Sequence, residues 1–417
     1  MLKQIEGSRA VAEAVAMCRP QVICAYPITP QTHIVEALSA MVKKEELRAE
    51  FLNVESEFAA MSVAIGASAA GARAYTATAS QGLLYMSEAV WNASGLGLPI
   101  VMTVANRAIG APINIWNDHS DAMSQRDAGW LQLYAETSQE ALDLHIQAFR
   151  IAEELSVPVM VCMDGFLLTH ASERADLPEQ AQVDAFLPRY EPRQVLDPAA
   201  PVSIGAMVGP EAFTEVRYLA FERMQQALGV IAETAADFRA QFGRDSGGLI
   251  RPYLTDGAET VVVALGSTLG TVKDTVDELR ADGMKIGALG ITSFRPFPLD
   301  AVREALAAAR HVVVLERALA PGTGGIVTAD IRTALAGRLT PHLSTVIAGL
   351  GGRSITRKSL RAMLATAAAG ELGPLTFLDL DTTLVDRELA RMRAARRSGP
   401  TAENLLRDLG ITAARIG

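Results

Sequence analysis

The sequence predicts an α/β protein whose sheets are parallel and covered by helices on both faces. Three observations support this class. The 417 residues are enough for two or three domains. The composition, 49% hydrophobic and 20% charged, is that of a globular chain. Short β-rich runs of consecutive apolar residues alternate with longer helical stretches, as expected of strands that are buried on both faces.

A first α/β series occupies the N-terminal part of the chain. We expect its strands at 21–26, 49–54, 73–77, 99–105 and 157–163, and its helices at 30–44, 55–70, 81–94 and 138–155. Residues 171–210 are rich in proline, acidic residues and glutamine, so we expect them to run over the surface of this domain. Residues 211–242 are predicted to form one or two helices.

A second, shorter series follows. We expect its strands at 260–265, 285–291, 311–316 and 343–348, and its helices at 269–281, 299–309 and 325–337. The chain is therefore predicted to contain a first domain, a linker, a second domain and a charged helical tail that packs on a neighbouring chain. These parts occupy residues 1–245, 246–258, 259–380 and 381–417.

Charge and hydropathy exclude several classes of partner. The net charge of −9 disfavours nucleic acid and anionic membranes as partners. No apolar run reaches the roughly 18 residues that span a bilayer, and the first residues are polar, so we expect a cytoplasmic protein. Cys18, Cys24 and Cys162 are too scattered for an iron–sulfur cluster on this chain and are interpreted as small buried residues.

Phosphate-binding motifs are also missing from the sequence. It has no GxGxxG and no GxxxxGK[ST]. Asp164-Gly165 begins a possible diphosphate and magnesium motif, but no asparagine follows within about forty residues to complete the ligand set. If this chain uses a diphosphate cofactor, another chain must therefore hold the diphosphate, and we expect no metal site here.

Tyr26–Pro30 closes the first predicted strand and leads into a helix. Two prolines restrict the backbone around Thr29, so the hydroxyl is presented at the carboxyl end of the sheet, where open α/β sheets bind ligands. The alternative is that Thr29 caps the helix and Pro30 occupies its first position.

Glu55 and Glu57 lie at the next junction between a strand and a helix. Small apolar residues follow, which indicates close and dry packing, and a carboxylate there can share a proton with a buried heterocycle. The alternative is an acid that is stabilised by the first turn of the helix.

Further polar residues follow the later strands. Arg107 is the only Lys or Arg between Arg73 and Arg126, and it can clamp a carboxylate through two parallel hydrogen bonds or form a surface ion pair. Thr78–Gly82 forms a turn that either approaches a cofactor or caps a helix. Asp118–Asp121 is interpreted as a turn and helix cap rather than a metal site. The other histidines are interpreted as isolated, namely His33, His145, His170, His311 and His342.

Together and in this order, these motifs resemble the alpha subunit of the multi-subunit 2-oxoacid:ferredoxin oxidoreductases, most closely the pyruvate type. The resemblance covers nearly all of the chain up to about residue 380. It rests on Tyr26–Pro30, Glu55–Glu57, Thr78–Gly82, Asn106–Gly110 and Asn117–Asp121, and in the second series on Leu265–Ser267 and Phe294–Pro298. It implies a domain that binds the pyrimidine end of thiamine diphosphate and a second domain similar to the C-terminal domain of transketolase.

The resemblance also implies roles for individual residues. Glu57 would face the pyrimidine ring as the catalytic acid, with Glu55 as the rival, and Thr29 and Arg107 would bind the substrate carboxylate. The remaining cofactor contacts would come from Pro27, Ile28, Ser80 and Gln81.

The implied reaction is the oxidative decarboxylation of a 2-oxoacid with coenzyme A to acyl-CoA and CO2. A beta subunit would bind the diphosphate and Mg²⁺ and carry iron–sulfur clusters, gamma and delta subunits or equivalents would complete a dimer of heteromers, and ferredoxin would accept the electrons. A small apolar pocket that favours pyruvate is expected from Ile109, Ala111, Ile113 and Ile115. The alternatives are a thiamine-dependent dehydrogenase component that passes the acyl group to lipoamide, and a noncatalytic assembly subunit.

Overall fold

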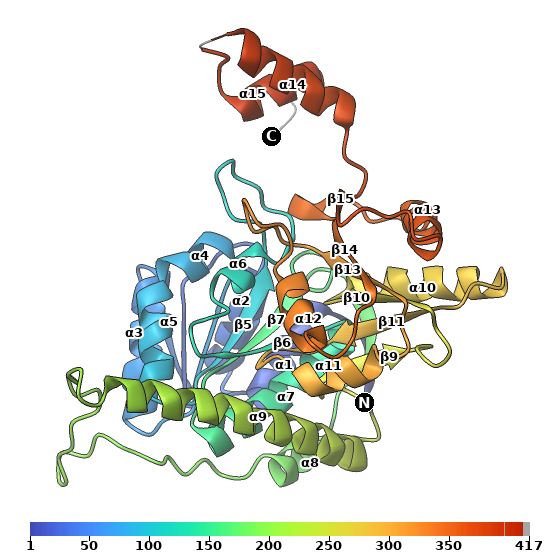
Figure 1. Ribbon diagram of the computed structural model, residues 1–417. Helices are drawn as coiled ribbons and strands as arrows, with labels where there is room; N and C mark the ends of the chain where they lie inside the picture. Colours follow the sequence, from blue (N-terminus) through green and yellow to red (C-terminus); the bar gives the residue numbers. More distant parts are fainter. Residues whose placement is uncertain (396, 412–417) are drawn as a thin grey trace. The chain divides into compact units, whose positions relative to one another are not determined.

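A mixed sheet organises the N-terminal part of the chain, and three of its strands, β5, β6 and β7, are labelled in Figure 1. Its strand order is β12-β6-β7-β5-β4-β2-β3. The computed structural model describes residues 1–395 and 397–411. The strands are β2 (Val22–Ala25), β3 (Glu50–Asn53), β4 (Ala74–Thr78), β5 (Val101–Asn106), β6 (Leu131–Tyr134), β7 (Val159–Asp164) and β12 (Ser293–Arg295). Neighbouring strands run parallel, except that β12 pairs antiparallel with β6. The five strands expected in the first series are present, and the short strand β6 was not anticipated.

Helices cover both faces of this sheet, as the sequence predicted. One face carries α1 (Gly7–Met17), α2 (Thr32–Lys43) and α7 (Ser138–Leu155), and the other carries α3 (Glu57–Ala69) and α5 (Ser87–Gly95). Adjacent residues of one strand therefore enter different cores: Ile23 and Tyr75 pack with α1 and α7, whereas Cys24 and Ala74 pack with α3 and α5. The single helix expected at 81–94 is two helices, α4 (Ser80–Tyr85) and α5.

The second series forms a sheet with the order β15-β14-β13-β10-β11-β9. Its strands are β9 (Ile250–Tyr253), β10 (Thr260–Ala264), β11 (Ile286–Ile291), β13 (His311–Glu316), β14 (His342–Ile347) and β15 (Leu375–Phe377). Its helices are α10 (Thr268–Ala281), α11 (Leu299–Ala305), α12 (Val327–Leu335) and α13 (Arg357–Ala368). Apolar residues of this sheet share one core with α3 and α5. Because β12 belongs to the first sheet, the two series are joined by backbone pairing as well as by packing.

The segment expected to be irregular from residue 171 is ordered at its start. Strand β8 (Ser172–Asp176) pairs antiparallel with β1 (Leu2–Glu6), and α8 (Gln180–Phe186) follows. The surface excursion therefore begins only after α8. It ends at α9 (Phe213–Phe242), a single helix that contacts α7.

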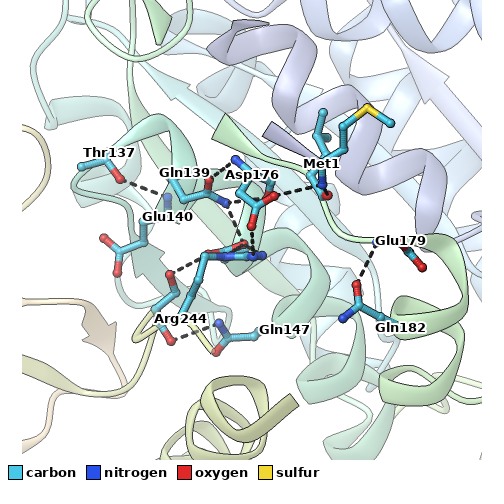
Figure 2. Close-up of polar contacts among 12 residues, drawn as sticks. Met1, Thr137, Gln139, Glu140, Gln147, Asp176, Glu179, Gln182 and Arg244 are labelled. Carbon is cyan, nitrogen blue, oxygen red and sulfur yellow. Dashed lines mark hydrogen bonds and ion pairs between the residues drawn. The ribbon is translucent and has the colours of Figure 1, made fainter. Parts of the chain in front are cut away.

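Polar contacts fasten the segment after α9 onto α7 (Figure 2). Arg244 Nη2 donates to Asp143 Oδ1 at 2.7 Å, and Nη1 lies 3.4 Å from Asp176 Oδ2. The Ser246 hydroxyl donates to Asp143 Oδ2 at 2.7 Å, and Gln147 Nε2 donates to the Ser246 carbonyl at 3.1 Å. The beginning of the expected linker is thus bonded to the first series.

The chain separates into two compact units, Met1–Thr376 and Phe377–Gly417. The second contains α14 (Thr382–Ala394) and α15 (Thr401–Asp408), which are joined by Arg391 Nη2 and Asp408 Oδ2 at 2.9 Å. Within the predicted tail, Arg396 and residues 412–417 lie outside the described residues. Over the ranges that are described, no helix combines the length and the apolar character needed to cross a bilayer.

Candidate active site

The predicted site residues follow four neighbouring strands at the same edge of the first sheet. Thr29 follows β2, Glu57 follows β3, Ser80 follows β4 and Arg107 follows β5. These strands run parallel, so their carboxyl ends meet at one edge. The chain passes from β2 to β3 on one side and then places β4 on the other side of β2. This is a topological switch point, where open α/β sheets bind ligands.

Glu57 is a buried residue whose carboxylate lacks a partner among the described residues. Glu57 is the first residue of α3, after Ser56, whose hydroxyl accepts a hydrogen bond from the Ala59 amide at 3.1 Å. It is 7% exposed, whereas Glu55 is exposed. Within residues 1–395 and 397–411, no group forms a hydrogen bond or an ion pair with the Glu57 side chain. The carboxylate oxygens are not among the fully enclosed unpaired atoms of the described residues, so this end of the side chain is accessible and can bind a polar group from outside this chain.

Gly82 makes room for the Glu57 side chain. A Cβ atom at Gly82, in α4, would lie 2.7 Å from Glu57 Oε1 and 2.6 Å from Thr78 Oγ1. The Thr78 hydroxyl is itself buried and has no partner in the part of the chain that the structure describes. Glu57 therefore lies against α4 in a space that only glycine leaves open.

Arg107 is a buried cation that is oriented but not neutralised. It is 6% exposed, and its Nη1 donates to the Thr29 carbonyl at 2.9 Å while Nε donates to the Asn114 carbonyl at 3.1 Å. Burial lowers the pKa of Arg107, and the charge of Asp121 opposes that shift. Among the residues that the structure describes, no carboxylate forms an ion pair with Arg107 and nothing accepts a hydrogen bond from Nη2. The guanidinium is therefore oriented to bind an anion through Nη2.

Asp121 joins the loops that follow β4 and β5. It lies in α6 (Ser120–Ser124) and is fully buried. Its Oδ2 accepts hydrogen bonds from the Ser80 and Arg107 amides, both at 2.9 Å, and its Oδ1 accepts from Asn106 Nδ2 and the Ala122 amide, both at 2.8 Å. Burial raises the pKa of Asp121 to about 6, against these hydrogen bonds, which lower it. Sequence reasoning missed this role, because it considered Asp121 only as part of a local turn.

The Asp164 carboxylate forms ion pairs and hydrogen bonds with other residues of this chain. Its Oδ1 lies 2.8 Å from His119 Nε2, and its Oδ2 lies 3.0 Å from Arg317 Nη1 and accepts from the Ser267 amide at 2.8 Å. Burial acts to raise the pKa of Asp164, but Arg317 and His119 hold it well below its ordinary value. Asp164 thus connects the first sheet with the second series.

Ser80 and Gln81 approach the loop after β5. Ser80 has a φ of +49°, and its Oγ lies 2.5 Å from the Ala108 carbonyl and contacts Gln81 Oε1. A Cβ atom at Gly110 would lie 2.5 Å from Gln81 Nε2. Neither Thr78 nor Ser80 caps α4, because the capping position is Ala79.

The structure around Thr29 excludes the alternative interpretation of this residue as a helix cap. Gln31 occupies the capping position of α2, so the interpretation of Thr29 as the helix cap is wrong. Thr29 is exposed instead, next to exposed Pro27 and half-buried Ile28.

The four residues expected to form an apolar pocket do not enclose one within this chain. Ile113 is 78% and Ile115 is 42% exposed, Ala111 is also exposed, and Ile109 is half-buried. These side chains lie in the irregular segment between β5 and α6.

The cysteines are small buried residues, as predicted. Cys18, Cys24 and Cys162 are all buried and free. Burial raises the pKa of Cys24 to about 12 and also raises those of Cys18 and Cys162. Thiols in such surroundings are poor metal ligands and nucleophiles.

Comparisons with known proteins identify matching families and relatives. Residues 13–236 match the family described as pyruvate flavodoxin/ferredoxin oxidoreductase, thiamine diphosphate-binding, and residues 258–360 match pyruvate:ferredoxin oxidoreductase core domain II. The pyruvate synthase subunit PorA of Methanosarcina barkeri is 49% identical over 390 residues, covering 91% of this chain and 97% of that protein. The ketoisovalerate oxidoreductase subunit VorA of Pyrococcus abyssi is 40% identical over 363 residues, covering 87% and 92%.

A solved structure supports the fold. The 2-oxoglutarate:ferredoxin oxidoreductase of Magnetococcus marinus, with 2-oxoglutarate, coenzyme A and succinyl-CoA bound, matches with a TM-score of 0.70 at 19% identity. The match covers 88% of this chain and 65% of that longer chain. This likeness confirms the predicted α/β architecture.

Proposed function

The chain belongs to the pyruvate flavodoxin/ferredoxin oxidoreductase family, and we propose that it supplies one half of a thiamine-dependent active site that oxidises pyruvate or a similar small 2-oxoacid. It is the alpha subunit of a 2-oxoacid:ferredoxin oxidoreductase that uses coenzyme A. The observation that carries the proposal is the presence of two buried residues of opposite charge, Glu57 and Arg107, at the switch point of the sheet, neither of which has an ion-pair partner among the described residues.

Glu57 is the residue that fits the pyrimidine end of the cofactor. Thiamine diphosphate, when bound, supplies a thiazolium that takes up the electrons released on decarboxylation. The Glu57 carboxylate would accept a hydrogen bond from the pyrimidine and hold the proton that the ring exchanges. Burial of Glu57 and exposure of Glu55 favour Glu57 in this role. Other cofactor contacts are assigned to Pro27, Ile28, Ser80 and Gln81.

Arg107 and Thr29 are assigned to the substrate carboxylate. A buried guanidinium binds a carboxylate more strongly than an exposed one, because water competes less. Arg107 would hold the 2-oxoacid until its carboxylate leaves as CO2, and the Thr29 hydroxyl would add a second polar contact. Arg317 is already paired with Asp164 and so does not offer a second cation for a dicarboxylic substrate. The open loop at Ile113 and Ile115 would need a wall from a partner chain.

The remaining parts of the site are assigned to partner subunits. Asp164 is held by Arg317 and His119, so this chain offers no free acid at that position for Mg²⁺ and diphosphate. A beta subunit would bind both and carry the iron–sulfur clusters, with gamma and delta subunits or equivalents and ferredoxin completing the electron path. A cytoplasmic location and a dimer of heteromers stay predictions. The family match favours ferredoxin over lipoamide as the acceptor, and the retained site geometry disfavours a noncatalytic subunit.

The test is an assay of the complex assembled around this chain. We expect reduction of a viologen dye that depends on pyruvate, coenzyme A and thiamine diphosphate. The same complex assembled with Glu57→Gln should lose this activity. Acyl transfer to lipoamide without dye reduction, or equal rates with the variant, would contradict the proposal.

A further inference from the structure

Glu6, His33 and His170 form a cluster of metal-ligating side chains outside the thiamine site. Each residue offers one ligand atom, and these atoms lie within 4.8 Å of one another. The interpretation of His33 and His170 as isolated histidines is therefore wrong. They are far apart in the sequence, and the fold brings together the end of β1, the first turn of α2 and the turn before β8.

Backbone bonds hold Glu6 and His170 close to each other. In the β1–β8 ladder Glu6 is opposite Ser172, and the Gly7 amide donates to the Ala171 carbonyl at 3.0 Å. The Ser8 hydroxyl, at the start of α1, donates to the Thr169 carbonyl at 2.8 Å. Glu6 is thus held in the β1–β8 ladder, and the turn that carries His170 is held next to it by these two hydrogen bonds.

His33 completes the cluster from α2. Its Nδ1 lies 2.6 Å from Glu6 Oε1, and its ring centroid lies 4.6 Å from that of His170. The side chains of His33 and Glu6 are 45% and 27% exposed, so water can reach the cluster. An ion or solvent molecule can therefore enter without a change of fold.

His170 is oriented by its neighbours. Its Nδ1 lies 2.7 Å from Thr169 Oγ1, and that oxygen also accepts a hydrogen bond from the Phe166 amide at 2.8 Å. The Phe166 ring packs 4.8 Å from the His170 ring, centroid to centroid. This leaves Nε2 available. A histidine whose other ring nitrogen is hydrogen-bonded in this way is typical of metal ligands.

We propose that Glu6, His33 and His170 bind a divalent transition metal, with Zn²⁺ the best match. Two imidazoles and one carboxylate form a donor set that zinc prefers, and water would take the fourth tetrahedral position. With metal–ligand bonds of about 2.0–2.2 Å, the ligand atoms of a tetrahedral site lie roughly 3.3–3.6 Å apart. His33 Nδ1 and Glu6 Oε1, now 2.6 Å apart, would therefore separate as the ion replaces the proton between them, and the His170 nitrogen, within 4.8 Å of both, would approach by side-chain rotation. The ion would tie α2, just after Thr29, to β1 and β8. The evidence for this metal site is independent of the proposed thiamine-dependent function.

The test uses the full chain after treatment with a chelator, with cobalt(II) as the spectroscopic probe and zinc(II) as competitor. We expect the visible absorption of four-coordinate cobalt(II), its displacement by zinc, and its loss in His33→Gln and His170→Gln. Thr169→Val should weaken cobalt binding about 10- to 100-fold, because it removes the group that orients His170. His342→Gln is the matched control, since His342 lies in another histidine pair, with His311, whose ring centroids are 5.8 Å apart.

Two results would overturn the site. One is the absence of the cobalt(II) absorption band in the wild-type chain. The other is a cobalt(II) titration curve of His33→Gln that equals that of the wild type. Circular dichroism without metal verifies that each variant is folded. His33 is the decisive position, because its side chain is 45% exposed and its replacement should not disturb the fold.

Discussion

The guanidinium of Arg107 donates from Nη1 to the main-chain carbonyl of Thr29 at 2.9 Å. This contact spans from β5 to β2 across β4, which lies between them. A carbonyl oxygen fixes the direction of the guanidinium but carries no full charge, so Arg107 is held in place while its charge stays available. Preorganisation of this kind is what favours binding of an anion.

Replacement of Arg107 should weaken substrate binding. A hydrogen bond to a charged group contributes about 1.5–3 kcal/mol, so Arg107→Ala should raise the KM for pyruvate roughly 10- to 150-fold. Arg107→Lys should also be impaired, because lysine cannot reproduce both main-chain bonds and the planar contact with a carboxylate. Steady-state kinetics of the assembled complex provide the measurement. Arg19→Ala is the control, since Arg19 pairs with Asp184 on the surface, and an unchanged KM in Arg107→Ala would remove Arg107 from substrate binding.

Replacement of Glu57 should act on turnover rather than on cofactor binding. Glu57→Gln keeps the shape of the side chain but cannot exchange a proton, so we expect kcat to fall by at least about 100-fold while thiamine diphosphate is still bound. Glu55→Gln, at an exposed position of the same junction, should leave kcat near the wild-type value. The opposite pattern in the two variants would transfer the role to Glu55.

A methyl group at position 82 should damage the site without unfolding it. In Gly82→Ala the new Cβ would lie 2.7 Å from Glu57 Oε1, and the carboxylate would have to move. Displacement of about 1 Å can lower kcat/KM about 100-fold. Gly66→Ala is a matched helical control, because no described atom beyond its chain neighbours and its own helix backbone would lie within 4 Å of the new Cβ. Alanine also favours a helix over glycine by about 1 kcal/mol. Equal activity of the two variants would show that Gly82 does not position Glu57.

Asp121→Asn should loosen both loops of the site. One oxygen of the carboxylate becomes an amide donor that faces donors, and each unsatisfied group costs about 1–3 kcal/mol. We expect a lower free energy of unfolding and a higher KM for pyruvate. Wild-type stability and KM in this variant would mean that Asp121 does not hold Ser80 and Arg107 in place.

The pH dependence of stability offers an independent test of Asp121. Burial raises its pKa to about 6, above the ordinary value of 3.8, so the folded protein binds a proton more tightly than the unfolded chain. Its contribution to the free energy of unfolding is therefore largest below about pH 3.8 and decreases as the pH rises to about 6. The difference in stability between wild type and Asp121→Asn should follow this course and level off above pH 6. A difference that is constant from pH 4 to 7 would contradict it.

The sequence predicted that the candidate residues meet at one edge of the sheet, but it did not predict the contacts that hold them in place. Thr29, Glu57, Ser80 and Arg107 each follow an apolar strand, and strand ends of a parallel sheet meet at one edge, so local patterns were sufficient. Local patterns were not sufficient to choose between Glu55 and Glu57, because both lie at the same junction. The difference between them is the packing of Glu57 against Gly82, which is a tertiary contact.

Long-range contacts explain most of the features that the sequence did not predict. Asp121 binds amides at positions 80 and 107, and no local pattern reports such partners. The same applies to the Glu6, His33 and His170 cluster: Glu6 and His170 are brought together by the pairing of β1 with β8, and His33 joins them from α2. The pairing of β12 with β6 joins segments from the two series and leaves no periodic signal in either.

The most direct test of the central claim is a structure of the assembled complex with thiamine diphosphate bound. We predict that a carboxylate oxygen of Glu57 lies within hydrogen-bond distance, roughly 2.6–3.2 Å, of a pyrimidine nitrogen, with the diphosphate on the partner subunit. A cofactor bound elsewhere, or a Glu57 carboxylate turned away from the pyrimidine, would contradict the account.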